Sequence, residues 1–594
     1  MKVMSYNQRV ISSMEHSKTD KTSKKPSRQP LGHLVLEKSL RADGFRGDIS
    51  VSADLLDKYA TDESIFSIRP QVVIQPKDTD DVAIAVKIVN QEVAKFPSLS
   101  LTPRAAGTGL GGGSLTDSVV IDVNKYLNRI LRVGRTNDQV TFTAESGAWW
   151  RDVEAELKKY DSYLPPYPAS KQICTIGGAV ANNAAGPDSL RYGHVANWIE
   201  SLEVVLHDGN IYNIKPLTYS EFQKLIKEKS ELAKIAKKVF NLIEKNESLI
   251  NKSEPKEAKN NAGYLLWDVL DTTVAEFKAG SGSFDLTRLL AGSQGTIGII
   301  TKVTMRTAPI SHDIELIVLP VFNLASAGKV VLEANKYQPI NVEVFDAFTY
   351  QAALSNPDFF HNRIKSKYLF QRVIWAMNYN YKVRWKGVLP EFVMLVTLDR
   401  SDIRDSHNNI NDIVTKLKKI GGDQVRLVKG KYDREMFWQI RDASYLLSKL
   451  LDPNKRPAAF LEDMAVPPEY ISKFFNDIKH LLKKYKVQAA VHGHGGNAHF
   501  HFYPLLDFTQ PETRDTVMKM ADDFFAAAVK YGGSICGEHN DGIIRTPYLD
   551  LMYSKKTLEL FKEIEHIFDP HDIFNPGKKV NPRFDVRDSI RSTN

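Results

Sequence analysis

The sequence predicts an α+β protein of two or three domains, and three observations support this fold class. At 594 residues the chain is longer than one ordinary hydrophobic core supports. Its first half alternates short strand-like runs and helices with glycine-rich loops. From about Pro309 the character changes, and apolar runs such as Glu315–Val321 and Glu391–Leu398 are separated by helical segments, which indicates a second domain built on a sheet.

Composition excludes several protein classes. A chain with 42% hydrophobic and 25% charged residues is typical of soluble globular proteins, and the net charge of +8 is mild. The first thirty residues are polar and basic, so we expect a disordered tail there. The two cysteines are too few for a disulfide framework or an iron–sulfur cluster. With no membrane span or secretory signal in view, we expect a cytoplasmic protein without a nucleic-acid partner, and leave contact with the inner face of a membrane open.

The loop Pro103–Ser114, PRAAGTGLGGGS, has five glycines in twelve residues. Glycines permit positive φ and let successive backbone N–H groups converge on an anion. A flexible linker is the alternative, but strand-like runs at Leu99–Thr102 and Val119–Val123 bracket the loop closely. The loop also matches GxGxxG, which signals a Rossmann fold only when a helix follows. A strand follows here, so we predict a phosphate-binding loop of another kind.

Local patterns predict the remaining elements in order. Helices are expected where apolar residues recur at helical spacing, and strands where they alternate or run continuously. A hairpin is expected where His207–Asn210 separates two strands. Lysine-rich residues 215–260 read as a solvated helical insertion. The expected strands are Val72–Ile74, Gln139–Ala144, Leu202–Leu206, Ile211–Ile214, Asn341–Phe345 and Glu462–Pro467, and the expected helices are Val82–Val93, Val153–Leu157, Asp412–Ile420, Phe437–Leu450 and Lys556–Phe568.

Two further glycine clusters and one histidine cluster stand out. Thr175–Gly186, TIGGAVANNAAG, indicates either close helix packing or backbone next to a ligand, and Leu289–Thr304 carries a third glycine motif. Val491–Phe502, VHGHGGNAHFHF, holds four of the fifteen histidines. Alternate strand residues face the same way, so His499 and His501 can converge on one site, and His492 can fold back towards His499. Imidazoles with a carboxylate, for which Glu538 of GEHND is the candidate, suit a divalent transition metal. Histidines that merely satisfy hydrogen bonds are the alternative.

Together these motifs resemble the FAD-linked oxidases and dehydrogenases of the vanillyl-alcohol-oxidase-like superfamily, with a PCMH-type FAD-binding domain. The resemblance covers about residues 48–582 and is carried, in family order, by PRAAGTGLGGGS, TIGGAVANNAAG, GSQGTIGIIT, HGHGGNAH, GEHNDG and DIFNPGK. It is greatest to the D-lactate, glycolate and D-2-hydroxyglutarate type. It implies a tail and lead-in over 1–47, a flavin domain of two α+β subdomains over 48–308, a substrate domain with an antiparallel sheet over 309–533, and a segment, 534–594, that returns to the flavin domain.

The resemblance also implies site residues. His492, His499 and Glu538 correspond to the family's metal ligands, and zinc or manganese is the expected ion. His539 matches the catalytic histidine, Arg441 the residue that holds the substrate carboxylate, and Tyr445 and His501 lie near the substrate. FAD, held without a covalent bond, is expected at Arg104, Ala105, Ala106, Gly107, Thr108, Gly109, Ser114, Pro168, Thr175, Gly178, Asn182, Gly186, Tyr192, Gln294, Ile300 and Asn575.

Some positions depart from the family pattern. Gly495 stands where relatives usually have an acid, Tyr445 replaces a smaller hydroxyl residue, and Gln294 replaces a common glutamate.

The favoured hypothesis is metal-assisted oxidation of a D-2-hydroxyacid, D-lactate or D-2-hydroxyglutarate, with hydride transfer to FAD. A non-redox transferase resembling alkyl-dihydroxyacetone-phosphate synthase is the rival, and a flavin-bearing partner of a larger complex is a third reading. Without the iron–sulfur domain of some large relatives, electrons would pass to oxygen, a quinone or an electron-transfer protein. A homodimer remains open.

Overall fold

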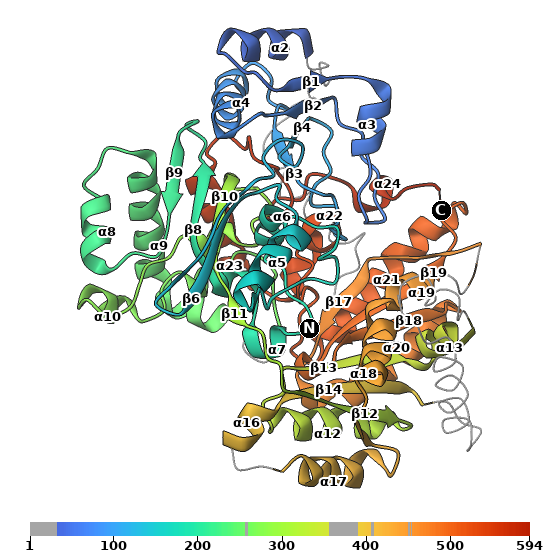
Figure 1. Cartoon of the computed structure of the whole chain (residues 1–594). Coiled ribbons are helices and arrows are strands. Elements are labelled where there is room, and N and C mark those ends of the chain that lie inside the picture. Colours follow the sequence, from blue (N-terminus) through green and yellow to red (C-terminus); the bar gives the residue numbers. More distant parts are fainter. Residues whose placement is uncertain are drawn as a thin grey trace.

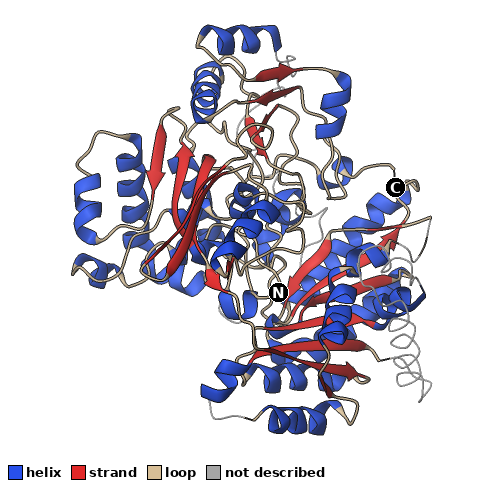
Figure 2. Ribbon diagram, viewed as in Figure 1, coloured by secondary structure: helices blue, strands red, loops and turns tan. Residues whose placement is uncertain are grey.

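The structure is a computed structural model that describes residues 33–255, 259–355, 390–405, 409–449, 452 and 454–593. Residues 1–32, most of the predicted tail, lie outside this range. The described chain has three sheet-containing parts: two small ones and one large one, which lies at the lower right of Figure 1. The predicted α+β class is confirmed, with helices and strands interspersed throughout (Figure 2).

The first part holds the glycine loop Pro103–Ser114. Its strands lie in the order β1 (Asp48–Ser50), β2 (Val72–Gln75), β4 (Val119–Asp122) and β3 (Leu101–Arg104), with helices α2 (His33–Ala42), α3 (Ala53–Tyr59) and α4 (Thr79–Glu92). The Asp78 side chain caps α4 by accepting from the Asp81 N–H. β3 and β4 are parallel, so the chain between them must run back along the length of the strands and cannot turn tightly as in a hairpin.

The second part is an antiparallel five-stranded sheet. Its order is β5 (Ile130–Thr136), β6 (Gln139–Glu145), β10 (Ile299–Arg306), β8 (Ile199–Val205) and β9 (Ile211–Ile214), and β8 and β9 form the expected hairpin. A short pair, β7 (Ser162–Tyr163) with β11 (Ala308–Pro309), lies beside it. The helical elements are α5 (Trp150–Leu157), η1 (Lys158–Tyr160), α6 (Ile176–Asn182), α7 (Ser189–Tyr192), η2 (Val195–Trp198), α8 (Tyr219–Leu225), α9 (Glu231–Ser253), η3 (Leu266–Asp268), α10 (Val274–Lys278) and α11 (Thr287–Leu290).

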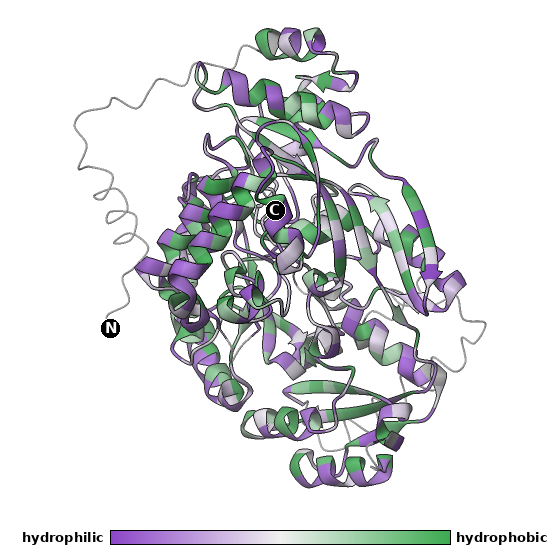
Figure 3. Ribbon diagram, turned by 90° about the vertical axis from the view of Figure 1, so that its left-hand side faces the viewer, coloured by the Kyte–Doolittle hydropathy of each residue, from purple (hydrophilic) through white to green (hydrophobic). Residues whose placement is uncertain are grey.

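The lysine-rich insertion is less solvated than its composition suggested. One face of α9, including Ile235, Val239 and Leu242, is buried in the main core. The surface helices accordingly carry purple and green residues side by side in Figure 3. An amphipathic helix of this kind covers a core while its lysines stay in water.

The third part is the large sheet of the second predicted domain, and its paired strands are antiparallel. The strand order is β15 (Arg426–Val428), β12 (Ile314–Val321), β14 (Phe392–Asp399), β13 (Asn341–Asp346), β18 (Ala489–His494), β19 (His499–Leu506) and β16 (Arg456–Pro457), and β17 (Leu461–Ala465) also pairs with β19. The helical elements are α12 (Leu324–Asn335), α13 (Ala347–Ser355), α16 (Arg400–Asp405), α17 (Ile410–Gly421), α18 (Lys431–Asp442), α19 (Ser444–Ser448), η4 (Pro468–Tyr470), α20 (Ile471–Tyr485), η5 (Gly495–Asn497) and α21 (Glu512–Val529).

Both faces of this sheet are covered, which explains its continuous apolar strands. Leu316 and Val318 belong to a core with Phe437 of α18, whereas Ile317 and Leu319 belong to the main core that includes α12, α17 and α20. The helix expected over Phe437–Leu450 is two helices, α18 and α19, and Leu450 lies outside the described residues.

The last segment comprises α22 (Gly542–Arg545), η6 (Thr546–Leu551), α23 (Lys555–Phe568) and α24 (Val586–Ser589). Phe574 forms a parallel bridge with Leu101, and the Asn575 N–H donates to the Leu101 carbonyl at 2.9 Å. The segment therefore returns to the strand that leads into the glycine loop. In the part of the chain that the structure describes, no helix combines the length and apolar character needed to cross a bilayer.

Candidate functional site

The glycine loop presents backbone rather than side chains. Residues 105–110 are only partly buried, and Gly109 is exposed. A Cβ atom at Gly109 would meet no heavy atom within 4 Å, and Gly107 has a φ of +70°. Glycines at positive φ, with open space beside Gly109, let backbone N–H groups approach an anion, as an anion-binding site requires. The loop therefore suits the phosphates of a dinucleotide.

Two predicted FAD residues have partners within the protein. The buried Arg104 guanidinium donates to the carbonyls of Tyr59 at 3.2 Å and Thr61 at 2.8 Å. Ser114 Oγ donates to Asp62 Oδ2 at 3.2 Å. Arg104 and Ser114 thus anchor the two ends of the loop to residues 59–62. The loop residues Ala105, Ala106 and Thr108 lie between these two anchors in the sequence.

The second glycine cluster packs against the first. Thr175 caps α6, with Oγ1 accepting from the Gly178 N–H at 3.2 Å, and a Cβ at Gly178 would lie 3.1 Å from that of Ala105. A Cβ at Gly186 would collide with the Tyr167 carbonyl, next to Pro168. Asn182 Nδ2 donates to the Glu538 carbonyl at 2.9 Å. Close packing thus accounts for the small residues, and it joins the glycine loops to the histidine cluster.

The remaining predicted FAD residues connect the third glycine motif to the other two. Asn575 Nδ2 donates to the carbonyls of Gly113 at 2.8 Å and Gln294 at 2.7 Å. The Gln294 Oε1 atom accepts from the Gly542 N–H at 2.9 Å. The Ile300 carbonyl accepts from Ser146 Oγ, and the Tyr192 ring lies edge-on to Trp198.

The histidines lie on two adjacent antiparallel strands. The register of β18 and β19 places His492 opposite His501 and His494 opposite His499. Directly opposed residues, and those two positions apart, share one face of a sheet, so all four imidazoles lie on the same face. This register brings together residues up to nine positions apart in the sequence.

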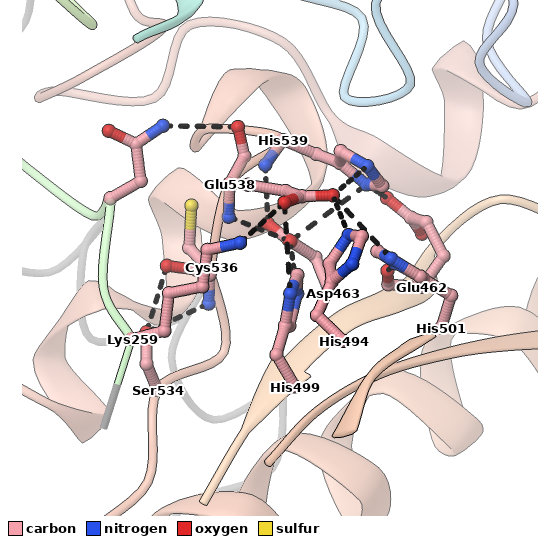
Figure 4. A network of polar contacts seen from close by, with 12 residues as sticks. Lys259, Glu462, Asp463, His494, His499, His501, Ser534, Cys536, Glu538 and His539 are labelled. Carbon is pink, nitrogen blue, oxygen red and sulfur yellow. Dashed lines mark hydrogen bonds and ion pairs between the residues drawn. The ribbon is translucent and has the colours of Figure 1, made fainter. Parts of the chain in front are cut away.

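Three of these histidines converge with Glu538 on one point (Figure 4). His494, His499, His501 and Glu538 are buried, and each offers a ligand atom within 4.8 Å of the others. A second set, Asp463, His501 and His539, satisfies the same criterion and shares His501. Nitrogen and carboxylate donors in this number suit a divalent transition ion.

The outer contacts of the three imidazoles support this interpretation. His494 Nδ1 lies 2.8 Å from Glu343 Oε1, His499 Nε2 lies 2.9 Å from Asp463 Oδ1, and His501 Nδ1 contacts the Glu462 carbonyl. Metal-binding histidines are typically held in this way by a carboxylate or carbonyl on the nitrogen away from the ion. His499 Nδ1, on the inner side, is buried without a hydrogen-bond partner. The residues therefore fit a metal ion.

His492 is not part of this group, although the expected ligand set was His492, His499 and Glu538. Its ring stacks on Tyr503 with centroids 5.2 Å apart, and its buried Nδ1 has no hydrogen-bond partner. The Glu538 carboxylate lies within 3.2–3.8 Å of nitrogen atoms of His494, His499 and His501. It sits over the His494–His499 pair, and His492 belongs to the pair two positions along the strand. The structure instead brings in His494, for which we predicted no role.

Electrostatics favour neutral His499 and His501 beside a charged Glu538, whereas for His494 burial is outweighed by the charges of Glu343 and Glu538, which raise its pKa. Burial lowers the pKa of His501 well below its usual value and that of His499 to about 4. Burial would raise the pKa of Glu538, but Lys259 and the neighbouring histidines hold it well below the ordinary value. For His539, burial is outweighed by the charge of Asp463 and by hydrogen bonds to Glu462 and Glu538, which raise the pKa to about 10.

Arg441 is buried next to this cluster, and Tyr445 follows it. Arg441 Nε donates to Glu343 Oε2 at 2.7 Å, so its ion pair is with Glu343 and not with its sequence neighbour Asp442. The other Glu343 oxygen holds His494. The Tyr445 ring lies 5.0 Å from that of Tyr503, which stacks on His492.

Four residues that line the cluster were not predicted: Lys259, Glu343, Glu462 and Asp463. Asp463 also accepts from the backbone N–H groups of Glu538 at 2.9 Å and His539 at 2.8 Å. The signal that could have found Glu343 is a carboxylate between two valines of a predicted strand, because a buried charge needs a partner. No comparable sequence signal identifies Lys259.

Comparison with known proteins gives two family matches. Residues 70–215 match the FAD binding domain, and residues 310–579 match the C-terminal domain of FAD linked oxidases. The chain is 27% identical over 571 residues to D-2-hydroxyglutarate dehydrogenase of Escherichia coli, covering 92% of this chain and 52% of that protein. It is 24% identical over 535 residues to D-lactate dehydrogenase of Archaeoglobus fulgidus, covering 88% and 96%.

The chain thus spans about half the length of the D-2-hydroxyglutarate dehydrogenases that it matches. Among solved structures, alkyldihydroxyacetonephosphate synthase superposes with a TM-score of 0.61 at 15% identity, covering 95% of this chain and 92% of that one. At this identity the likeness shows the fold alone.

Proposed function

Because the chain belongs to the FAD-linked oxidases with a PCMH-type FAD-binding domain, we propose that it oxidises a D-2-hydroxyacid to the corresponding 2-oxoacid. D-lactate and D-2-hydroxyglutarate are the substrate class, by the names of the relatives. The observation that carries the proposal is the buried group of His494, His499, His501 and Glu538, which lies beside the FAD-binding motifs and provides polar ligands for a hydroxyacid site.

The protein's part in FAD chemistry is to position the cofactor. The Gly107–Gly113 backbone would hold the pyrophosphate, and Asn575 Nδ2 ties the Gly113 carbonyl of the loop to the Gln294 carbonyl. When bound, FAD accepts the hydride from the substrate C2 atom. The electrons would leave the protein through an external acceptor, for which we propose oxygen, a quinone or an electron-transfer protein.

We assign the metal site to His494, His499, His501 and Glu538. A divalent ion, zinc or manganese, polarises the substrate hydroxyl when bound there. Arg441 would hold the substrate carboxylate through its terminal guanidinium nitrogens, since Glu343 occupies Nε. Glu343 contacts both Arg441 and His494, so one carboxylate orients the substrate anchor and a metal ligand together.

His539 is assigned as the group that takes the hydroxyl proton, for which its raised pKa must first fall; a divalent cation on Glu538 would lower it by charge repulsion. Its side chain is 19% exposed, compared with 0–6% for Glu538 and for the three imidazoles of the group. Nδ1 lies 3.3 Å from Glu462 Oε1, which leaves Nε2 turned toward Glu538 at 3.4 Å. A general base needs to be anchored on one nitrogen and within reach of the substrate on the other.

The test is anaerobic reduction of the bound flavin. FAD-loaded protein mixed with D-lactate or D-2-hydroxyglutarate should lose its visible flavin absorbance, whereas the L-enantiomers should leave it unchanged. Oxidised flavin that persists with a panel of D-2-hydroxyacids would contradict the proposal and favour the non-redox transferase reading.

A further inference from the structure

Lys259 brings a second cation to the candidate metal ligand Glu538. Its Nζ atom donates to Glu538 Oε2 at 2.6 Å and to Ser189 Oγ at 3.0 Å. The Lys259 side chain is 3% exposed and the Glu538 side chain 6% exposed. Lys259 lies at the end of the region that the sequence analysis treated as a solvated insertion, far in the chain from the histidines.

The two oxygens of Glu538 face different partners. Oε2 lies 2.6 Å from Lys259 Nζ and 3.8 Å from His499 Nδ1, whereas Oε1 lies 3.2 Å from His494 Nε2 and 3.5 Å from His501 Nε2. In Figure 4, Lys259 approaches the carboxylate from the side away from His494 and His501. With Oε2 engaged by the lysine, Oε1 is the oxygen better placed to ligate an ion beside His494 and His501.

We infer that Lys259 is a positioning residue that shares Glu538 with the metal ion: it holds Oε2, restricts the carboxylate to ligation through Oε1, and weakens the hold of the site on the ion. This inference rests on the metal site assigned above. Two cations on one buried carboxylate repel each other with little screening by water or salt. The consequence is an exchangeable ion in a site of higher positive charge, which suits an anionic hydroxyacid.

Removing the lysine charge should therefore tighten ion binding. In Lys259→Met, the Kd for Zn²⁺ should fall about tenfold or more, because the loss of repulsion next to a buried ion outweighs the loss of one orienting bond. Glu538 retains its backbone hydrogen bond to Asp463 at 2.9 Å, which keeps it near the histidines. Lys259→Arg keeps the charge and should bind Zn²⁺ as the parent protein does.

The measurement is Zn²⁺ affinity by competition with a chromophoric chelator, on FAD-loaded full-length chains whose flavin spectrum shows that they are folded. Lys530→Met is the matched control, because Lys530 pairs with Asp477 on the surface with 59% of its side chain exposed. If Lys259→Met does not accumulate, Lys259→Gln provides a second neutral variant with the same expected result.

The outcomes separate the two proposals. Tighter Zn²⁺ binding in the neutral variant, with parent-like binding in Lys259→Arg and Lys530→Met, supports the inference. Unchanged or weaker binding in Lys259→Met or Lys259→Gln overturns it and leaves the metal site in place. A parent protein that binds no stoichiometric Zn²⁺ overturns the metal site, and the role of Lys259 with it.

Discussion

The glycine loop and the histidine cluster are built in opposite ways. The loop Pro103–Ser114 is a continuous segment whose active surface is backbone, fixed from behind by Arg104 and Asn575. The cluster is made of buried side chains from separate segments: two strands of the large sheet, β13 and β17 beside them, Lys259, and the stretch that holds Glu538. The loop is shaped by the backbone geometry of one segment, whereas the cluster is assembled by packing and charge between residues far apart in the chain.

This difference implies that the two sites can be disabled separately. The contacts between them run through a few hydrogen bonds, such as Asn182 Nδ2 to the Glu538 carbonyl. A side-chain change in the cluster should therefore leave FAD bound, and a backbone change in the loop should leave the metal ligands intact. The predictions below test that separation, starting from the largest expected effect.

His499→Ala should abolish turnover by releasing the metal ion, while FAD stays bound. His539→Ala, the matched variant, should keep both ion and flavin and lose activity by about 10²–10⁴-fold, the usual contribution of a general base. Metal analysis and the visible flavin spectrum of the purified variants distinguish the two. Equal metal content in both variants would contradict the assignment of His499 as a ligand.

Arg441→Lys should lower kcat/KM about tenfold to a hundredfold, because an ammonium group cannot reproduce a two-nitrogen contact with a carboxylate. Steady-state kinetics with an artificial dye acceptor measure the effect, with the flavin spectrum as a check on folding. Glu343→Gln should produce a smaller loss, since Arg441 would lose its 2.7 Å ion pair but keep its charge. Normal kinetics in Arg441→Lys would show that Arg441 does not hold the substrate and serves only as the ion-pair partner of Glu343.

Gly109→Ala should weaken FAD binding about tenfold without destabilising the apoprotein. The added methyl group meets no protein atom within 4 Å, so any loss reflects a ligand at that position. Gly134→Ala on β5 is the control, because its Cβ would approach only Arg132 Nε at 3.8 Å. Binding is measured by flavin fluorescence quenching, and a tenfold change is about 1.4 kcal/mol. Unaltered FAD affinity in Gly109→Ala would place the phosphates elsewhere.

The last prediction concerns a buried carboxylate whose hydrogen-bond partner is a tyrosine hydroxyl. Glu565 accepts a hydrogen bond from the Tyr264 hydroxyl at 2.6 Å, and burial raises the pKa of this acid to about 8, in contrast to Glu538 beside Lys259. Between the unfolded value near 4.5 and about 8, the native state binds a proton that the unfolded state has released. The free energy of unfolding should therefore fall as pH rises through this window, by on the order of a few kcal/mol.

Glu565→Gln should remove that part of the slope. The Tm of the parent should drop more than that of the variant between pH 5 and pH 8, as measured by thermal denaturation. Parallel Tm–pH curves would show that Glu565 is ionised in the folded protein.

The contrast between a continuous loop and a cluster of distant residues also explains which features could be predicted from the sequence. The glycine motifs, the amphipathic α4 and the β8–β9 hairpin follow from residues close together in the chain, and the structure contains them at the expected places. The antiparallel sheet of the second domain was also predicted, from the resemblance, and is present.

The detail of the cluster could not be predicted in the same way. Alternation predicts that His499 and His501 share a strand face, but whether His492 or His494 joins them at Glu538 depends on how a distant segment packs over the sheet. Lys259 and Glu343 reach the cluster from other parts of the fold, and their local sequences carry no metal-ligand spacing. Close approach of residues far apart in the chain is a property of packing, so it required the structure.

The most direct test of the account is to chelate the metal from active, FAD-loaded protein and measure three quantities together: bound metal, bound flavin and D-2-hydroxyacid oxidation. The account predicts that activity falls in proportion to the metal removed, that FAD stays bound, and that Zn²⁺ or Mn²⁺ restores turnover. Full activity in protein without a stoichiometric metal ion would contradict it and assign His494, His499 and His501 a purely hydrogen-bonding role.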